Sequence, residues 1–171
     1  MIVRPFGIRA SRPRKALLMR GCAPVALVLA AASIAMPSGA RAQAFNATPD
    51  IVQGNVTIDR SVPGLDTITV GGNDAVIDWT MFSVGPSPGP SPAPSPFLPD
   101  GHTALYRSLP GQPGFAVLNR VFGSDPAVFD GLVRAILRDG QGNPAGPGGF
   151  VAFYAPSGIL VGPTGRFEVP Q

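Results

Sequence analysis

Short apolar runs separated by glycine and proline make up most of the chain after residue 42. Residues 51–58 (IVQGNVTI) alternate roughly between apolar and polar positions, as a half-buried strand does. Residues 66–70 are rich in β-branched side chains, which suit a pleated sheet, and a glycine pair follows them as a turn signal. Residues 75–84 continue the extended pattern. We therefore expect a succession of short strands here.

The second half of the chain repeats this pattern with more turns. Two short strands are expected around Leu105 and Val117. Residues 126–137 have apolar groups at helical spacing, but an internal glycine and several β-branched side chains favour a strand. Residues 138–149 predict a loop because they are rich in glycine. The runs FVAFY, GILVG and RFEV then end the chain as three short strands, separated by APS and GPTG.

The sequence therefore predicts an all-β domain with strands of four to eight residues. Such a pattern is compatible with a sandwich, a barrel or a stacked parallel coil. The scarcity of hairpin signatures and the glycines at sharp corners favour the coil. No fixed repeat length can be demonstrated, so periodicity alone leaves the three architectures open.

Residues 1–42 have the organisation of a secretory signal peptide. Six basic and no acidic residues lie in the first 20 positions, and an uncharged apolar run follows from Cys22 to Met36. This run is short for a membrane span, which needs about 20 residues. Ala40-Arg41-Ala42 fits the small-x-small rule, so we expect cleavage after Ala42. An uncleaved anchor helix is the alternative.

Removal of this segment would reverse the charge of the protein. The remaining 129 residues contain six basic and ten acidic groups, a net charge of −4. A nucleic-acid partner needs a basic face, so no nucleic-acid binding is expected. Cys22 is the only cysteine and lies within the expected signal peptide, so no disulfide or thiolate ligand is expected afterwards.

Proline occupies every second position from 86 to 96. Each proline removes a backbone donor and keeps its predecessor extended, so residues 85–96 are expected to form a polyproline-type loop. A ligand for proline-reading domains is the sharper alternative.

Three segments resemble motifs of one known family. Residues 76–85 resemble its W-x-x-F-x-[IV]-G segment through Trp79 and Phe82, and residues 116–131 resemble its L-N-R-V segment through Leu118 to Val121. Residues 149–163 resemble its N-P-N-G-I turn through Pro156, Gly158 and Ile159. The chain is thus similar, from about residue 45 to the end, to the filamentous-haemagglutinin-like N-terminal domain of two-partner secretion exoproteins.

The resemblance implies a right-handed parallel β-helix, or β-solenoid, with a capping N-terminal segment. It implies export by the Sec machinery with processing by signal peptidase, passage through the periplasm, and recognition by the periplasmic POTRA domains of an outer-membrane β-barrel transporter. The secreted or surface-associated exoprotein then folds outside the cell, commonly as an adhesin or toxin carrier that reaches host or neighbouring cells through C-terminal repeats. Residues 43–171 would be this domain, truncated at its C-terminus.

One departure from the family pattern concerns the third motif. Both asparagines of Asn-Pro-Asn-Gly are absent, because Ala155 and Ser157 occupy these positions. Asparagine at such a corner bonds the backbone and tolerates left-handed angles. Ser157 could replace one such bond, whereas Ala155 could not.

The candidate motif or transporter-recognition residues are Asn119, Arg120, Pro156, Ser157, Gly158 and Ile159. Two interpretations of the first pair are open. In one, Arg120 is exposed and contacts the transporter; in the other, Asn119 bonds a corner and Arg120 pairs with a nearby aspartate. Trp79 is expected in the core.

No catalytic residue, metal site or cofactor is expected. The letters G-x-S-x-G at residues 85–89 lie among prolines that preclude the helix of a nucleophile elbow, and His102 is the only histidine. The serious enzymatic alternative is a polysaccharide-active β-helix, with Asp74 and Asp78, or Asp125 and Asp130, as paired acids. A purely structural surface protein is the third interpretation.

Overall fold

The computed structural model describes residues 43–82 and 95–170. All regular secondary structure in these residues is β-strand, which confirms the expectation of an all-β domain. The expected signal peptide and most of the expected proline-rich loop lie outside the described residues. The strands are β1 (Ala47–Gln53), β2 (Val56–Val62), β3 (Leu65–Val70), β4 (Asp74–Met81), β5 (Thr103–Ser108), β6 (Ala116–Phe122), β7 (Ala127–Phe129), β8 (Leu132–Arg138), β9 (Pro144–Pro147), β10 (Phe150–Tyr154), β11 (Ile159–Val161) and β12 (Arg166–Glu168).

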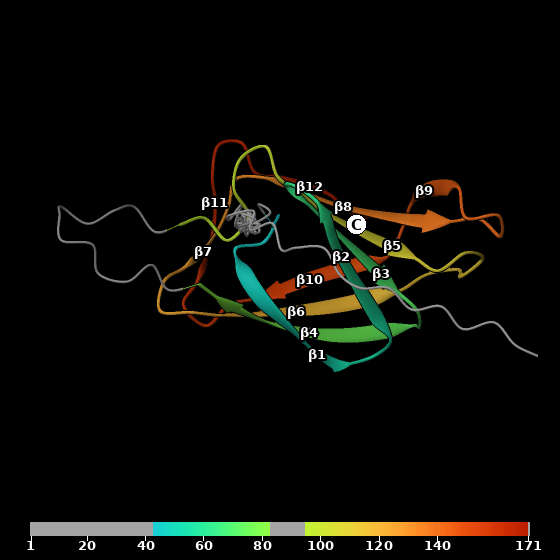
Figure 1. The fold of residues 1–171 in the computed structure, drawn as a ribbon, viewed down its shortest axis with the longest axis horizontal. Helices are drawn as coiled ribbons and strands as arrows, with labels where there is room; N and C mark the ends of the chain where they lie inside the picture. The colour runs from blue at the N-terminus through green and yellow to red at the C-terminus, as the bar shows by residue number, and fades with distance from the viewer. Residues whose placement is uncertain (1–42, 83–94, 171) are drawn as a thin grey trace, which may run out of the picture. The chain divides into compact units, whose positions relative to one another are not determined.

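The strands form three sheets (Figure 1). A four-stranded sheet has the order β1-β4-β6-β10, and a two-stranded sheet contains β7 and β11. A six-stranded sheet has the order β12-β8-β5-β3-β2, with β9 beside β8. Each order has two ends, so none of the described sheets closes into a barrel.

From β3 onward, the chain visits the sheets in a repeating order. It passes through the six-stranded sheet, then the four-stranded sheet, then the two-stranded sheet, and returns. We call each passage a circuit: β3 and β4 belong to the first, β5, β6 and β7 to the second, and β8, β10 and β11 to the third. In the first circuit, Leu98 occupies the third position through a bridge to Phe129. Strands of successive circuits pair in parallel.

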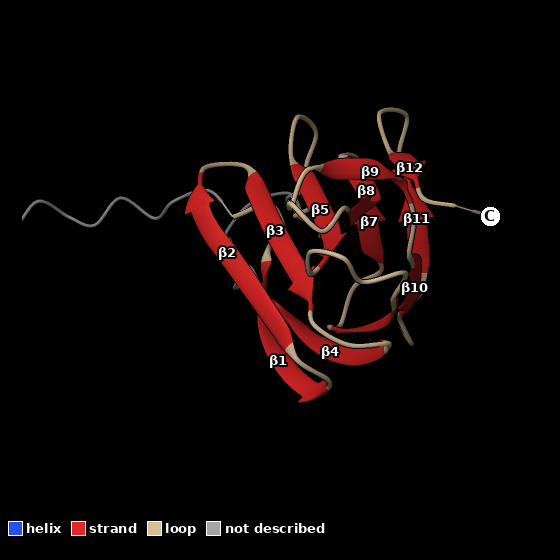
Figure 2. Cartoon of the chain, turned by 90° about the vertical axis from the view of Figure 1, so that its right-hand side faces the viewer, coloured by secondary structure: helices blue, strands red, loops and turns tan. Residues whose placement is uncertain are grey.

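Three strands interrupt this parallel pattern. At the N-terminal end, β1 pairs antiparallel with β4, and β2 pairs antiparallel with β3. Figure 2 shows β1 and β2 at the opposite end of the sheets from β10, β11 and β12. The third antiparallel strand is β9, which pairs with the second half of β8.

The expected strand boundaries require three corrections. The run 51–58 is divided between β1 and β2, because Gly54 adopts φ 89° and turns the chain. The single strand expected over 126–137 is divided into β7 and β8 by the turn at Asp130 and Gly131. The loop expected over 138–149 contains β9, whose prolines are tolerated because β9 is an edge strand.

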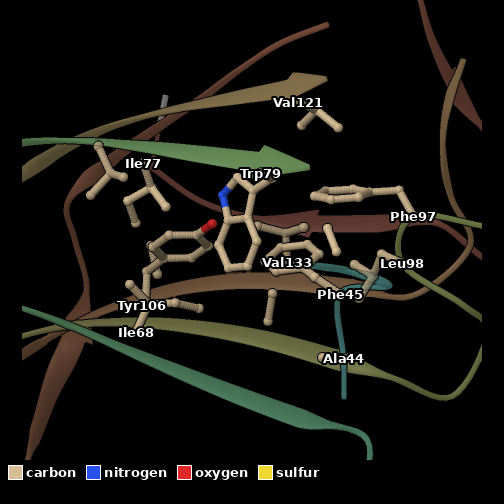
Figure 3. Packing of buried hydrophobic residues seen from close by; sticks show 14 of the residues in the cluster. Ala44, Phe45, Ile68, Ile77, Trp79, Phe97, Leu98, Tyr106, Val121 and Val133 are labelled. Carbon is tan, nitrogen blue, oxygen red and sulfur yellow. The ribbon is translucent and has the colours of Figure 1, made fainter. Parts of the chain in front are cut away.

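The interior is filled by apolar side chains from all three sheets, with aromatic rings at its centre (Figure 3). The Phe45 ring stacks on Phe97 with centroids 4.5 Å apart and lies 4.7 Å from Trp79. Phe129 and Phe153 continue the contact toward the later circuits, at 4.9 Å from each other. Trp79 is fully buried, which confirms its expected place in the core.

The turn between β7 and β8 depends on a glycine. A Cβ added at Gly131 would lie 2.5 Å from the carbonyl oxygen of His102 and 2.6 Å from that of Pro99. Backbone atoms cannot yield as a flexible side chain can, so Gly131→Ala should lower the free energy of unfolding by about 2 kcal/mol or more. Gly114→Ala is the matched control, because nothing lies within 4 Å of its added Cβ. Urea denaturation of the two variants measures the difference, and equal stabilities would contradict the structure.

Candidate functional site

The segment Leu118–Val121 lies in β6, in the middle of the parallel part of the four-stranded sheet. Side chains alternate along a strand, and β6 accordingly buries Val117, Asn119 and Val121 while Leu118 and Arg120 point outward. One strand thus presents a polar group to each side of the sheet. The two motif residues Asn119 and Arg120 therefore have separate roles.

The Asn119 side chain is fully buried and hydrogen-bonded at both ends. Its Oδ1 accepts hydrogen bonds from Trp79 Nε1 at 3.0 Å and from the Tyr106 hydroxyl at 2.8 Å. Its Nδ2 donates to the carbonyl oxygen of Ala152 at 3.1 Å. Figure 3 shows Trp79 and Tyr106 side by side in the core. The expectation that Asn119 bonds a corner was wrong, because its inward position in mid-strand directs it into the core.

Arg120 forms a two-point ion pair with Asp78 on the outer face of the sheet. The Arg120 Nε lies 2.6 Å from Asp78 Oδ1, and a terminal guanidinium nitrogen lies 2.8 Å from Oδ2. The pairing with an aspartate is the one that the second interpretation expects, and the side chain is also partly exposed, as the first interpretation requires. The hydrogen bond to Asp78 raises the pKa of Arg120. About a third of the Arg120 side chain stays exposed, and its guanidinium lies 5.9 Å from the Phe122 ring centroid.

The turn Ala155–Gly158 joins β10 to β11. The Gly158 amide donates to the Ala155 carbonyl at 3.0 Å, and Gly158 adopts φ 98°. Ser157 Oγ donates to the carbonyl of Gly123 at 2.6 Å, which fastens the turn to the preceding circuit. Ser157 therefore supplies one backbone bond at a position where the family pattern has asparagine. Pro156, Ser157, Gly158 and Ile159 are all exposed.

The structure connects these candidates only in part. Asn119 and Arg120 are adjacent in β6, and the turn reaches the residue after this strand through Ser157 and Gly123. Arg120 and the turn are accessible from outside, whereas Asn119 is not. Any surface recognised by a partner can therefore include Arg120 and the turn but not the Asn119 side chain.

Sequence reasoning missed a buried ion pair at the N-terminal end. Asp66 is fully buried, and its two oxygens accept hydrogen bonds from the amides of Ala44 and Phe45 at 3.0 and 3.2 Å. Arg60 lies 3.0 Å from the same carboxylate and donates twice to the carbonyl of Ala47. We call this group the N-terminal clamp. One feature of the sequence could have indicated this ion pair: Asp66 alternates with Ile68 and Val70, so it lies on the inward side of β3.

The N-terminal clamp holds the first described residues across one end of the core. Ala44, Phe45 and Ala47 are fully buried there. The Arg60 guanidinium lies 5.4 Å from the Trp79 ring, a distance typical of cation–π contacts. A buried charge that lost its partner would be strongly destabilising, so segment 43–47 is integral to the fold.

The geometry of the first candidate acid pair, Asp74 and Asp78, does not fit paired catalytic carboxylates. Asp74 and Asp78 are four residues apart in one strand, which places their Cα atoms about 13 Å apart. Paired catalytic carboxylates lie about 5 to 9.5 Å apart, and Asp78 is occupied by Arg120. Asp125 lies in the loop after β6 and Asp130 in the turn after β7.

His102 is half-buried, and its Nδ1 lies 3.0 Å from the carbonyl oxygen of Asp100.

Two further properties concern the described residues alone. Within residues 43–82 and 95–170, no three His, Cys, Asp or Glu side chains are grouped so that they could hold a metal ion. In the same part of the chain, no helix has the length and apolar character needed to cross a membrane.

The architecture and the polar contacts define an all-β protein of mixed sheets with polar bonds between successive circuits. Comparison of the chain with protein-family models, with curated proteins and with solved structures gives no match.

The hydrogen bonds of Asn119 predict a large loss of stability when the side chain is removed. Asn119→Ala would leave the Trp79 indole and the Tyr106 hydroxyl without their acceptor in the core. Each unsatisfied buried group costs about 1–3 kcal/mol, so we expect a loss of about 3 kcal/mol or more. Asn143→Ala, at an exposed turn, is the control and should change stability by less than about 1 kcal/mol. Chemical denaturation tests this, and a small effect of Asn119→Ala would contradict the assigned bonds.

The buried Tyr106 hydroxyl should make the free energy of unfolding decrease at alkaline pH. Burial, and next the negative charge of Asp66, raise its pKa well above the usual value of 10.0. Above pH 10 the unfolded chain therefore binds fewer protons at this position than the folded chain. The free energy of unfolding should fall as the pH rises, by at most about 1.4 kcal/mol per pH unit from this group.

Tyr106→Phe removes this contribution. The wild type should be more stable than Tyr106→Phe at pH 8, and the difference should shrink at pH 11. Urea unfolding of both proteins at the two pH values measures it. A difference that is unchanged between the two pH values would refute the raised pKa.

Proposed function

We propose that residues 43–171 form a secretion domain of the two-partner type, similar to the N-terminal domain of filamentous-haemagglutinin-like exoproteins. The domain would be a right-handed parallel β-helix that is exported to the periplasm with cleavage of residues 1–42 by signal peptidase. An outer-membrane β-barrel transporter with periplasmic POTRA domains would recognise it and pass it to the cell surface. Its own role would be that of a scaffold without enzymatic activity.

The circuits support the proposed architecture. In a parallel β-helix, each turn of the chain contributes one strand to each sheet, and strands of successive turns pair in parallel. The order of the three sheets along this chain follows that pattern from β3 to β12. The antiparallel strands β1 and β2, together with segment 43–47, would be the N-terminal cap.

One observation carries the proposal: residues from separate family-like motifs contact one another. Trp79 of the first motif donates to Asn119 of the second, and Asn119 donates to Ala152, shortly before the turn of the third. Strands β4 and β6, which contain Trp79 and Asn119, are also joined on the outer face of the sheet by the ion pair of Asp78 and Arg120. Motif residues that are distant in sequence thus have a common structural purpose, as expected if the likeness extends to the fold.

The proposed recognition surface consists of Arg120 and the exposed turn residues Pro156, Ser157 and Gly158. Ile159 pairs in register with buried Ala127 and points inward, so it is left out of this surface. The residues of the surface are accessible and contribute little to the core. The Arg120–Asp78 pair is partly exposed, so we expect Arg120→Ala to lower the free energy of unfolding by about 1–2 kcal/mol and to leave the domain folded. This separates recognition from folding, which a deletion of Leu118–Val121 would not do because Asn119 is a core residue.

The test is export of the full chain from a Gram-negative host, with and without a co-expressed two-partner transporter. We expect the protein in the medium only when the transporter is present. Arg120→Ala combined with Pro156→Ala should reduce the secreted amount about tenfold while the variant accumulates in the periplasm, because a recognition contact is lost. Immunoblots of the medium and the periplasm give the ratio.

Arg134→Ala is the matched control. Arg134 is an exposed arginine that pairs with Glu168 on the six-stranded sheet, away from the proposed surface. Its secretion should equal that of the wild type. Appearance of the wild type in the medium without any transporter, or its retention with every transporter of this class from the source genome, would refute the proposal and favour a structural surface protein.

A further inference from the structure

The last described strands, β10, β11 and β12, leave one end of the core uncovered. Within the described residues, β10, β11 and β12 each pair with a strand on one side only. The side chains that point inward there are Ile159, Val161 and Phe167, which pair in register with buried Ala127, Phe129 and Val133. They are 41%, 57% and 42% exposed. We call this surface the open end.

The two ends of the core differ in a way that indicates a partner. The N-terminal end is covered by segment 43–47 and by the N-terminal clamp. Edge strands that must avoid association usually contain charges, proline or a bulge. Strand β9, which lies on the same side of β8 as β12, contains two prolines and is protected in this way. Neither β10 nor β11 contains a charged residue or a proline. Their free backbone edges are therefore suited to further strand pairing.

The only charges on the three edge strands lie in β12, as Arg166-Phe167-Glu168. If two copies of β12 pair antiparallel with Phe167 opposite Phe167, Arg166 of each copy faces Glu168 of the other. Opposite charges at directly paired positions are favourable, and like charges are unfavourable. Within the same chain, Arg134 Nε lies 3.2 Å from Glu168 Oε2, and both side chains are about half exposed. The sequence of β12 is thus complementary to itself in this orientation.

The same orientation accounts for the other two strands. A two-fold axis through the middle of β12 places the four-stranded sheet of one copy against the two-stranded sheet of the other. Strand β10 of each copy then meets β11 of the other copy. Both strands are apolar, and no charge is buried without an opposite partner. A head-to-tail contact would instead place the open end against the end that segment 43–47 already covers.

We propose that the open end binds a second copy of this chain, in a two-fold arrangement centred on Phe167. The contact pairs β12 with β12 and covers the exposed interior side chains of both copies. This inference rests on the geometry of the chain and does not depend on the proposed secretion function.

The first test is a cross-link. Residues directly opposite in antiparallel strands have Cα atoms about 4.5–5.5 Å apart, within the range that a disulfide spans. Cys22 is the only natural cysteine, so Phe167→Cys in a Cys22→Ser background offers one thiol. The full chain should give a covalent dimer under mild oxidation. Thr57→Cys in the same background is the control, because exposed Thr57 lies in β2 at the other end.

The second test keeps Phe167 in place. Light scattering of the otherwise unaltered chain should give twice the mass of one chain at micromolar concentration. Arg166→Glu should raise the dissociation constant about tenfold or more, because it places like charges opposite each other twice. Arg107→Glu, on β5 in the second circuit, reverses a charge away from the open end and should have no effect. Circular dichroism establishes that each variant is folded.

Three outcomes would overturn the proposal. The chain could remain monomeric at micromolar concentration. The cross-link could form only in a mixture of the Phe167→Cys and Thr57→Cys chains, which would mean a head-to-tail contact. Association could also be unaffected by Arg166→Glu. Secretion with a transporter is measured separately, so failure of this proposal and failure of the proposed function are distinguishable.

Discussion

The structure depends on one polar side chain placed in an apolar interior. Asn119 receives hydrogen bonds from Trp79 of the first circuit and Tyr106 of the second, and it donates to Ala152 of the third. A shift of β6 by one residue would turn Asn119 outward and leave these buried groups without partners. A shift by two residues would keep apolar side chains inward but would move this amide away from its three partners. Its bonds therefore fix how three successive circuits are aligned.

The apolar side chains at the two ends of the core differ in how far they are covered. A stack of strands exposes its interior at the first and the last layer. At the first layer, the chain folds back on itself, and the N-terminal clamp of Asp66 and Arg60 fixes segment 43–47 over the core. At the last described layer, nothing from the described residues covers Val161 and Phe167. The clamp is polar because it binds backbone, and the open end is apolar because it continues the core.

Most of the strands and the all-β class could be predicted from the sequence. The alternation of apolar and polar residues and the glycines at turns are local signals, which can be recognised within a few residues. The sequence also placed Trp79 in the core, and one of its two interpretations paired Arg120 with an aspartate. The role of Asn119 could not be deduced, since its partners are 13 to 40 residues away and are chosen by register. Asp66 was missed for the same reason. Strand β9 was missed because its prolines argue against a strand unless its edge position is known.

The spacing of the contacts has a consequence for how the chain folds. The bonds between successive circuits join residues 42, 40 and 33 positions apart, as in Asp78 with Arg120, Trp79 with Asn119, and Asn119 with Ala152. The clamp spans only 21 and 22 positions. In quasi-one-dimensional architectures each layer is stabilised chiefly by its neighbour, so order can spread from one layer to the next. A chain that emerges from its N-terminus can therefore close the clamp first and add circuits in sequence, without waiting for its last residues.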